Sequence, residues 1–261
     1  MPVVRRRRLL FGVLPVAAIL LATACATPDA QAHSPQPETA ERNARPPLAL
    51  VYNGPQGCTA CAPSVAALLR RAPQPYRVEM LTSPPTAEKL AEAKVYVQPG
   101  GGADLDRTWR DLSGAAEVVR TWVRDGGSYL GLCFGAYLAG RNPGFDLLPG
   151  DTNGYIDSPG ATVPDGRDTV IPVTWRGKPR HMYFQDGPAF FLRDGHNATV
   201  LATYDNGLPA VVVAPYGKGR VGVSGPHPEA DESWYEEKDL TNPDGVRFDM
   251  AYELIEETTR R

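Results

Sequence analysis

Short apolar runs alternate with segments of helical spacing between residues 48 and 140, and this alternation limits the fold more than any other feature. Strands that alternate with helices form parallel sheets, because each helix returns the chain to the edge where the previous strand began. Helices then cover both faces, so the strands read as unbroken apolar runs. The predicted strands are LALVYN, YRVEML, KVYVQ and SYLGLC, and the predicted helices are APSVAALLRRA, PPTAEKLAEA, SGAAEVVRTWVRDGG and FGAYLAG.

The pattern changes after about residue 150. The runs TVIPVTW, RHMYFQ, ATVLATY, LPAVVVAP and RVGVSG are separated by short turns such as DNG and YGKG, which is typical of hairpins. A helix, GVRFDMAYELIEETTR, closes the sequence. We therefore predict an α/β fold with a doubly wound, mostly parallel sheet and antiparallel strands in the C-terminal half. No linker separates the halves, so we expect one domain over residues 48–261.

Residues 1–24 have the composition of an export signal. Four arginines, Arg5 to Arg8, precede the apolar stretch LLFGVLPVAAILLA, which is too short to be a good membrane span. Two processing sites compete. Ala24 ends an A-x-A site for ordinary secretion, whereas LATAC resembles a bacterial lipobox in which Cys25 receives the lipid.

Residues 25–47 are predicted to be a disordered tether, because they contain several prolines and almost no large apolar side chains. Removal of residues 1–24, which hold four arginines and no acidic residue, would change the formal charge from −3 to −7. An acidic mature protein is not expected to bind nucleic acid. We expect an exported bacterial protein, either held on the outer face of the cell membrane by a lipid on Cys25 or secreted.

Cys133 is the strongest candidate for a nucleophile. It lies in a G-x-C-x-G motif, between Gly131 and Gly135, where a predicted strand turns directly into a helix. This is the thiol form of the nucleophile elbow, which exposes the side chain at the carboxyl edge of the sheet. The start of the following helix favours the thiolate. The alternative is that Cys133 is a small residue that fills a buried turn.

A cysteine nucleophile usually needs a base, and the sequence contains four histidines. His33 lies in the predicted tether, His196 in a predicted surface turn, and His181 inside a predicted strand. His227 follows an apolar strand, and Glu229 stands two residues later, where an extended chain points both side chains the same way. A carboxylate placed there can orient the imidazole ring, so His227 is the best candidate base.

Three glycines, Gly100 to Gly102, end the predicted strand that should lie beside the Cys133 strand. Backbone N–H groups of Gly101 and Gly102 could hold an oxyanion there. Glycines that follow a strand also form ordinary turns, which is the alternative.

The motif Cys58-x-x-Cys61 lies between a predicted strand and a predicted helix, which is also the context of a thioredoxin-like redox motif. That fold carries a cis-proline in its downstream sheet, and none is evident in this sequence. A structural disulfide suits an exported protein. Two thiols with distant histidines give no recognisable metal-ligand spacing, so we expect no metal.

The motifs PGGGAD, GGSYLGLCFGAYLAG and SGPHPE, in this order, resemble the class I glutamine amidotransferase-like superfamily. With LVYNGP and GKGRVGVSGPHPE they resemble more narrowly the amidotransferase-like N-terminal domain of biotin-protein ligases, in its stand-alone bacterial form. The resemblance covers residues 48–229. It implies a flavodoxin-like fold, with Cys133 as nucleophile, His227 as base and Glu229 as the orienting acid.

Three functions are compatible with these patterns. The first is a cysteine-dependent hydrolase or amidotransferase acting on a small amide or similar acyl substrate. The second is a non-catalytic binding or regulatory module that retains the triad, and the third is a thiol–disulfide protein that uses Cys58 and Cys61. We expect a small-molecule substrate and no cofactor, and the sequence identifies no protein partner.

Overall fold

The computed structural model of the chain describes residues 45–102 and 104–260. The predicted export signal, Cys25 and most of the predicted tether lie outside these residues. The strands are β1 (Leu48–Tyr52), β2 (Arg77–Leu81), β3 (Ala93–Gln98), β4 (Ser128–Leu132), β5 (Gly150–Gly154), β6 (Thr169–Trp175), β7 (Lys178–Phe184), β8 (Pro188–Leu192), β9 (Thr199–Tyr204), β10 (Pro209–Tyr216) and β11 (Gly219–Ser224). The helices are α2 (Cys61–Arg71), α3 (Ala87–Ala91), α4 (Leu105–Leu112), α5 (Ala116–Arg124), α6 (Phe134–Leu138), α7 (Glu232–Glu236) and α8 (Asp249–Thr259).

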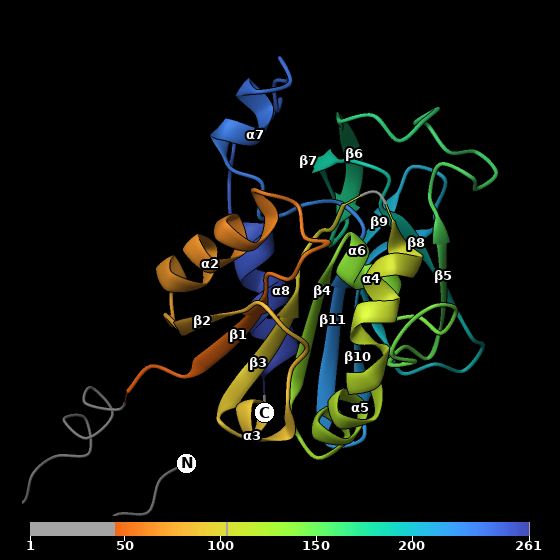
Figure 1. Ribbon diagram of the computed structural model, residues 1–261. Coiled ribbons are helices and arrows are strands. Elements are labelled where there is room, and N and C mark those ends of the chain that lie inside the picture. The colour runs from red at the N-terminus through yellow and green to blue at the C-terminus, as the bar shows by residue number, and fades with distance from the viewer. Residues whose placement is uncertain (1–44, 103, 261) are drawn as a thin grey trace, which may run out of the picture. The chain divides into compact units, whose positions relative to one another are not determined.

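The main sheet has the strand order β2-β1-β3-β4-β11-β10-β9-β6-β7 (Figure 1). The pairings from β2 to β11 are parallel, and those from β11 through β10, β9 and β6 to β7 are antiparallel. Strands β5 and β8 form a separate two-stranded antiparallel sheet. The predicted α/β class, with a mostly parallel sheet and antiparallel strands in the C-terminal half, is confirmed.

Helices pack on both faces of the main sheet, as expected for a doubly wound fold. On one face, Leu69 of α2 and Leu254 of α8 are buried in a single apolar cluster. On the other face, Val123 of α5 and Leu138 of α6 are buried in a second cluster, together with residues of α3 and α4. The sheet is therefore apolar on both sides, which explains the continuous hydrophobic runs of its strands.

Strand β11 belongs to both the parallel and the antiparallel part of the main sheet. It forms a hairpin with β10, but its other edge pairs in parallel with β4. Val221 and Val223 are fully buried, as a central strand requires. Gly222 allows α8 to approach closely, because a Cβ there would collide with the side chain of Thr258. This insertion brings the end of β11 beside the end of β4.

The predicted helix over residues 113–127 begins later than expected, at Ala116, and is preceded by α4 and a short 3-10 turn. Helix α4 was not predicted, because charged residues dominate its sequence. Asp104 begins it, since its Oδ1 accepts a hydrogen bond from the backbone N–H of Arg107 at 2.8 Å. None of the helices among the described residues is long and apolar enough to cross a membrane.

Candidate active site

Cys133 occupies the turn between β4 and α6 with a backbone φ of 49°. Non-glycine residues rarely adopt a positive φ, so this turn is strained, as nucleophile elbows are. The flanking glycines are sterically required. A Cβ on Gly131 would collide with the carbonyl oxygen of Gly135, and a Cβ on Gly135 with that of Gln98. The backbone N–H of Cys133 donates to Ser224 O at 2.9 Å, which fastens the elbow to β11.

His227 lies just beyond β11 and therefore beside the elbow. Its Nδ1 is 2.9 Å from Oε1 of Glu229, and the two side chains are only 3% and 0% exposed. The backbone N–H of His227 donates to Tyr183 O at 2.8 Å, which fixes the main chain at this point. With Nδ1 committed to Glu229, Nε2 is the ring nitrogen left to face the thiol.

The electrostatic surroundings of His227 favour the charged imidazolium. Burial would lower the pKa of His227, because a charged ring loses its water. The negative charges of Glu229 and Cys133, with hydrogen bonds to both side chains, outweigh burial and raise the pKa of His227 to about 10. His227 therefore keeps its proton at neutral pH and can stabilise a thiolate on Cys133.

The sulfur of Cys133 has a second partner. Its Sγ lies 3.5 Å from the carbonyl oxygen of Gln185, to which a protonated thiol can donate. A thiolate instead accepts from His227. Cys133 is 6% exposed and is the free cysteine of the described residues. The sulfur therefore lies between the His227 ring and the carbonyl oxygen of Gln185.

The two glycines predicted as oxyanion donors differ in the structure. The backbone N–H of Gly102 already donates to Gln56 O at 2.6 Å, so this amide is engaged elsewhere. Gly101 packs on the ring of Phe134, which a Cβ at position 101 would overlap. Phe134 directly follows the nucleophile, where an elbow supplies a backbone N–H to the oxyanion. Phe134 was not predicted from the sequence, although the G-x-C-x-G motif could have pointed to it. On this geometry Gly101 and Phe134 are the candidate oxyanion donors.

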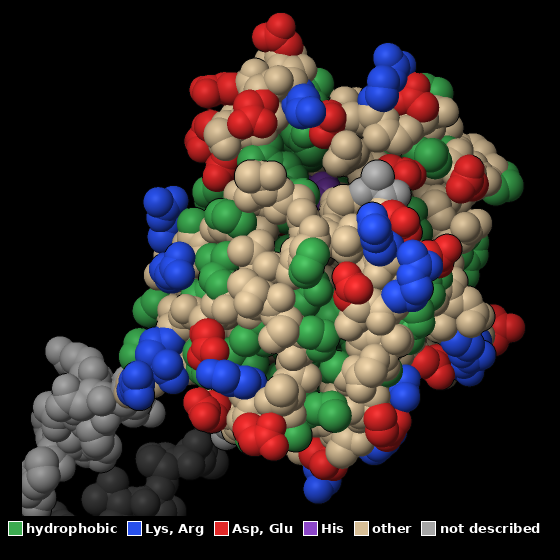
Figure 2. Space-filling view, in the orientation of Figure 1, with side chains coloured by type: hydrophobic (Ala, Val, Ile, Leu, Met, Phe, Trp, Pro, Cys, Tyr) green, Lys and Arg blue, Asp and Glu red, His purple; other side chains and the backbone are tan. Residues whose placement is uncertain are grey.

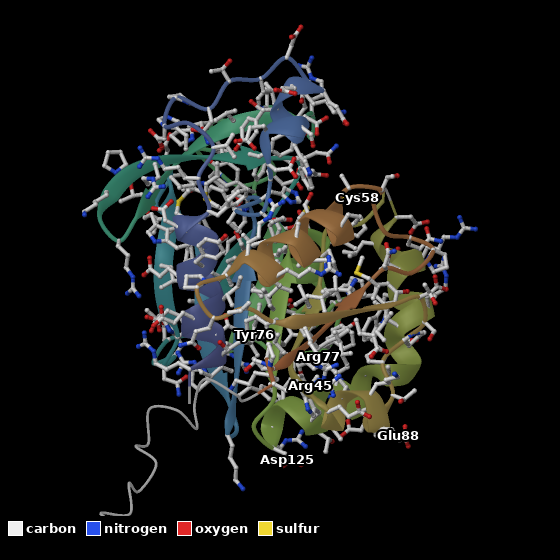
Figure 3. All side chains as sticks on the ribbon, turned by 90° about the vertical axis from the view of Figure 1, so that its left-hand side faces the viewer. Arg45, Cys58, Tyr76, Arg77, Glu88 and Asp125 are labelled. Carbon is white, nitrogen blue, oxygen red and sulfur yellow. A yellow bond between two sulfur atoms is a disulfide. The ribbon has the colours of Figure 1, made fainter. Side chains whose placement is uncertain are left out.

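A cavity of about 230 Å³ lies over the thiol. This volume is below the usual range for drug-sized ligands and suits a small substrate. A larger hollow of about 680 Å³ is lined in part by Trp122 and Asp125 and contains none of the candidate residues. Asp125 lies at the opposite end of the molecule from Cys58 (Figure 3). The side chains that line the smaller cavity include Cys133, His227, Cys58, Cys61, Asp168, Tyr183, Gln185, Trp234, Glu237 and Lys238.

Three polar side chains on the cavity wall near α7 were not predicted from the sequence. Asp168 accepts a hydrogen bond from the hydroxyl of Tyr183, and its Oδ2 is 3.1 Å from Nζ of Lys238. Burial would raise the pKa of Asp168, but these two partners lower it overall. The three residues come from separate segments, so no sequence motif indicates them.

Acidic side chains also gather over α7 (Figure 2), which disfavours strongly anionic substrates.

Cys58 and Cys61 form a disulfide at the start of α2. Cys58 lies at the N-terminal end of this helix, at the edge of the sheet far from Asp125 (Figure 3). A Cβ on Gly100 would lie 2.7 Å from Sγ of Cys61 and 3.2 Å from Cε1 of His227, so Gly100 separates the disulfide from the candidate base. The disulfide is therefore part of the wall of the cavity.

The other described histidines stand apart from the cavity. Nδ1 of His181 is 3.2 Å from Oδ2 of Asp244, and His196 is exposed in a turn, where its Nδ1 accepts from the backbone N–H of Ala198. His33 lies outside the described residues. Within residues 45–102 and 104–260, no group of three or more His, Cys, Asp or Glu side chains is arranged to hold a metal ion.

The sequence of this chain is similar to a known protein family and to a curated protein. Residues 48–153 match the family described as biotin-protein ligase, N-terminal. The biotin–protein ligase of Schizosaccharomyces pombe is 28% identical over 209 residues, which cover 69% of this chain and 33% of the ligase. The chain therefore spans about a third of the length of this curated relative.

Solved structures share the fold at low identity. A putative GMP synthase protein from Thermoplasma acidophilum is 11% identical, with a TM-score of 0.54 over 82% of this chain and 92% of that chain. A glutamine amidotransferase from Methylobacillus flagellatus is 13% identical, with a TM-score of 0.51 over 83% and 86%. These matches confirm the predicted resemblance to the biotin-protein ligase N-terminal domain, and they show that the fold is shared with glutamine amidotransferase-like structures.

Proposed function

We propose that this chain, whose fold is that of the glutamine amidotransferase-like proteins, is a cysteine-dependent hydrolase or amidotransferase acting on a small amide or similar acyl substrate. The observation that carries this proposal is the buried series Cys133, His227 and Glu229, with Nδ1 of the histidine 2.9 Å from the carboxylate. Burying two charged groups costs free energy unless they are paired. Pairing a histidine with both a thiol and a carboxylate is the arrangement that activates a cysteine nucleophile.

The chemistry assigns one role to each group. The thiolate of Cys133 attacks the carbonyl carbon, and the electron pair of the C=O bond moves to the oxygen. The N–H groups of Gly101 and Phe134 stabilise this oxyanion. His227 passes its proton to the leaving amine as the C–N bond breaks, leaving a thioester on Cys133. Water, deprotonated by His227, then attacks the thioester and releases the acid and the thiolate.

A non-catalytic binding module is the second candidate function, and one observation favours it. Sγ of Cys133 lies 3.5 Å from Gln185 O, a contact that suits a protonated, resting thiol. In that case the cavity of about 230 Å³ would bind a small ligand without cleaving it. The reactivity of the thiol separates the two functions, because a binding module has no need of an activated nucleophile.

The test is the rate at which iodoacetamide alkylates Cys133 near neutral pH. The proposed hydrolase predicts fast alkylation that slows by about tenfold or more in His227→Ala, since the imidazolium supports the thiolate. Mass spectrometry with a panel of small amides and thioesters then looks for an acyl group on Cys133. Ordinary thiol reactivity that is unchanged in His227→Ala would exclude the hydrolase and leave the binding module.

We also propose that the chain is exported and carries a lipid on Cys25. The support is the arginine cluster of residues 5–8, the short apolar stretch after it and the LATAC motif. The active domain would then be tethered at the outer face of the cell membrane. Secretion after cleavage at Ala24 is the alternative outcome.

A further inference from the structure

The loop between β1 and α2, residues 53–60, lies directly against the glycine segment, residues 100–102. The backbone N–H of Gly102 donates to Gln56 O at 2.6 Å. This backbone–backbone hydrogen bond restricts the movement of both segments. The glycine segment follows β3, whose last residues are buried, and the pairings of β3 with β1 and β4 end at Val97 and Gln98.

The hydrogen bond between Gly102 and Gln56 belongs to an isolated antiparallel bridge between Gly57 and Gly101. One further contact joins the same segments. Sγ of Cys61 lies against Gly100, since a Cβ on this glycine would be only 2.7 Å from the sulfur. Each residue of the glycine segment is thus held from the side of the β1–α2 loop, and the residue in the middle carries the N–H group assigned to the oxyanion.

The loop itself needs a support, because it contains two glycines and places no large side chain in the core. That support is the disulfide between Cys58 and Cys61. Cys61 is buried at the first turn of α2, and its backbone N–H donates to Sγ of Cys58 at 2.9 Å. Helix α2 is anchored in the core by Val65 and Leu69, which are fully buried. The disulfide therefore connects a rigid helix to the loop.

We propose that the Cys58–Cys61 disulfide is a positioning element of the oxyanion site, which holds the β1–α2 loop against the glycine segment and so aims the N–H of Gly101 at the substrate carbonyl. This inference rests on the proposed function. The acyl chemistry of Cys133 would then depend on the redox state of a second pair of cysteines.

Reduction by a dithiol such as dithiothreitol tests the idea in the unaltered chain. A thiolate of the reductant attacks Sγ of half-buried Cys58, the S–S bond breaks, and Cys61 leaves as a thiolate that takes a proton. The second thiol of the reductant then displaces Cys58 and closes the cyclic disulfide of the oxidised reductant. The protein gains two electrons and two protons, and the reductant is removed before measurement.

The first readout compares two reactions of Cys133. Alkylation by iodoacetamide passes through no oxyanion, whereas acylation by p-nitrophenyl acetate does. We expect reduction to lower the acylation rate by about tenfold, less than the roughly 100-fold loss of an entire oxyanion donor, while alkylation stays within about twofold. The Cys58→Ser/Cys61→Ser variant should match the reduced protein. Pro55→Ala, an exposed change in the same loop, is the control and should match the oxidised protein.

The second readout is hydrogen–deuterium exchange of the Gly102 amide, which does not depend on activity. Its protection should fall on reduction, while amides of β4 stay protected. If exchange at Gly102 is unchanged, or if acylation and alkylation fall in parallel, the disulfide does not position the oxyanion site. If Cys133 is unreactive even in the oxidised protein, the proposed function fails, and exchange at Gly102 still decides whether the disulfide holds the glycine segment.

Discussion

The backbone N–H of Cys133 donates a hydrogen bond to the carbonyl oxygen of Ser224 at 2.9 Å. Ser224 ends β11, and His227 follows three residues later. Because β11 runs parallel to β4, both strands deliver their last residues to the same edge of the sheet. This hydrogen bond joins the segment that carries the candidate nucleophile to the segment that carries the candidate base.

Replacing Glu229 by Gln should slow alkylation of Cys133 at neutral pH by about tenfold or more. The amide keeps the shape of the carboxylate but removes the charge that holds the proton on His227. Glu232→Gln, an exposed change on α7, is the matched control and should leave the rate unaltered. Equal rates in the two variants would remove Glu229 from the triad.

The stability of the Cys133→Ser variant should fall as the pH rises above 6.5, the ordinary pKa of histidine. With the thiol absent, we expect the charge of Glu229 and its hydrogen bond to outweigh burial and to keep the folded-state pKa of His227 above that value. A raised folded-state pKa gives stability that is full below the unfolded-state pKa and is lost as the pH rises through the folded-state pKa. The slope should be at most about 1.4 kcal/mol per pH unit.

Urea unfolding of Cys133→Ser between pH 6 and 9 measures this slope. The pKa values of the buried tyrosines Tyr96, Tyr129 and Tyr204 are raised by burial above 10, so they do not titrate in this range. Adding Glu229→Gln should flatten the curve. The same slope with and without the carboxylate would mean that Glu229 does not hold the proton on His227.

Gly135→Ala should destabilise the fold by about 1–3 kcal/mol or more, because its Cβ would collide with the backbone of Gln98. Gly114→Ala is the control. A Cβ at that position meets nothing within 4 Å, so unfolding free energy should change by less than about 1 kcal/mol. Denaturant titration compares the two. Equal stability of both variants would contradict the tight packing described for the elbow.

Mass spectrometry of the mature N-terminus from the native host should find Cys25 as the first residue, with lipid on its thiol. The expectation follows from the apolar stretch and the LATAC motif. A mature chain that begins after Ala24 with an unmodified cysteine would contradict lipidation and leave export intact. A chain that retains residues 1–24 would contradict export as well.

Apart from α4, the parallel half of the fold was predictable from sequence, because each strand there is a continuous apolar run and each predicted helix has a clear apolar face. The elbow was predictable for the same reason, since two glycines around Cys133 mark a sharp turn after a strand. The position of β11 in the sheet was not predictable, because a hairpin pattern identifies the neighbouring strand on one edge only. Its pairing with β4 depends on tertiary packing against α8.

The candidate oxyanion donors were also only partly predictable from sequence. The sequence marked the glycine segment, yet the preference for Gly101 over Gly102 depends on a backbone hydrogen bond from Gly102 to Gln56. The cluster of Asp168, Tyr183 and Lys238 had no signal at all, since three residues distant in sequence meet only after the segment around α7 packs beside β7. Local sequence patterns do not predict contacts between segments that are far apart in the chain.

The pairing of β4 with β11 has a consequence for the order of folding. Contacts between segments far apart in sequence form late, because the intervening chain must first be closed into a loop. Cys133 and the strand before it belong to the early, locally connected half, whereas His227 and Glu229 arrive only when β11 docks. Before β11 docks, Cys133 has neither His227 nor Glu229 beside it. Under the proposed function, the triad of Cys133, His227 and Glu229 would be complete only once β11 has docked beside β4.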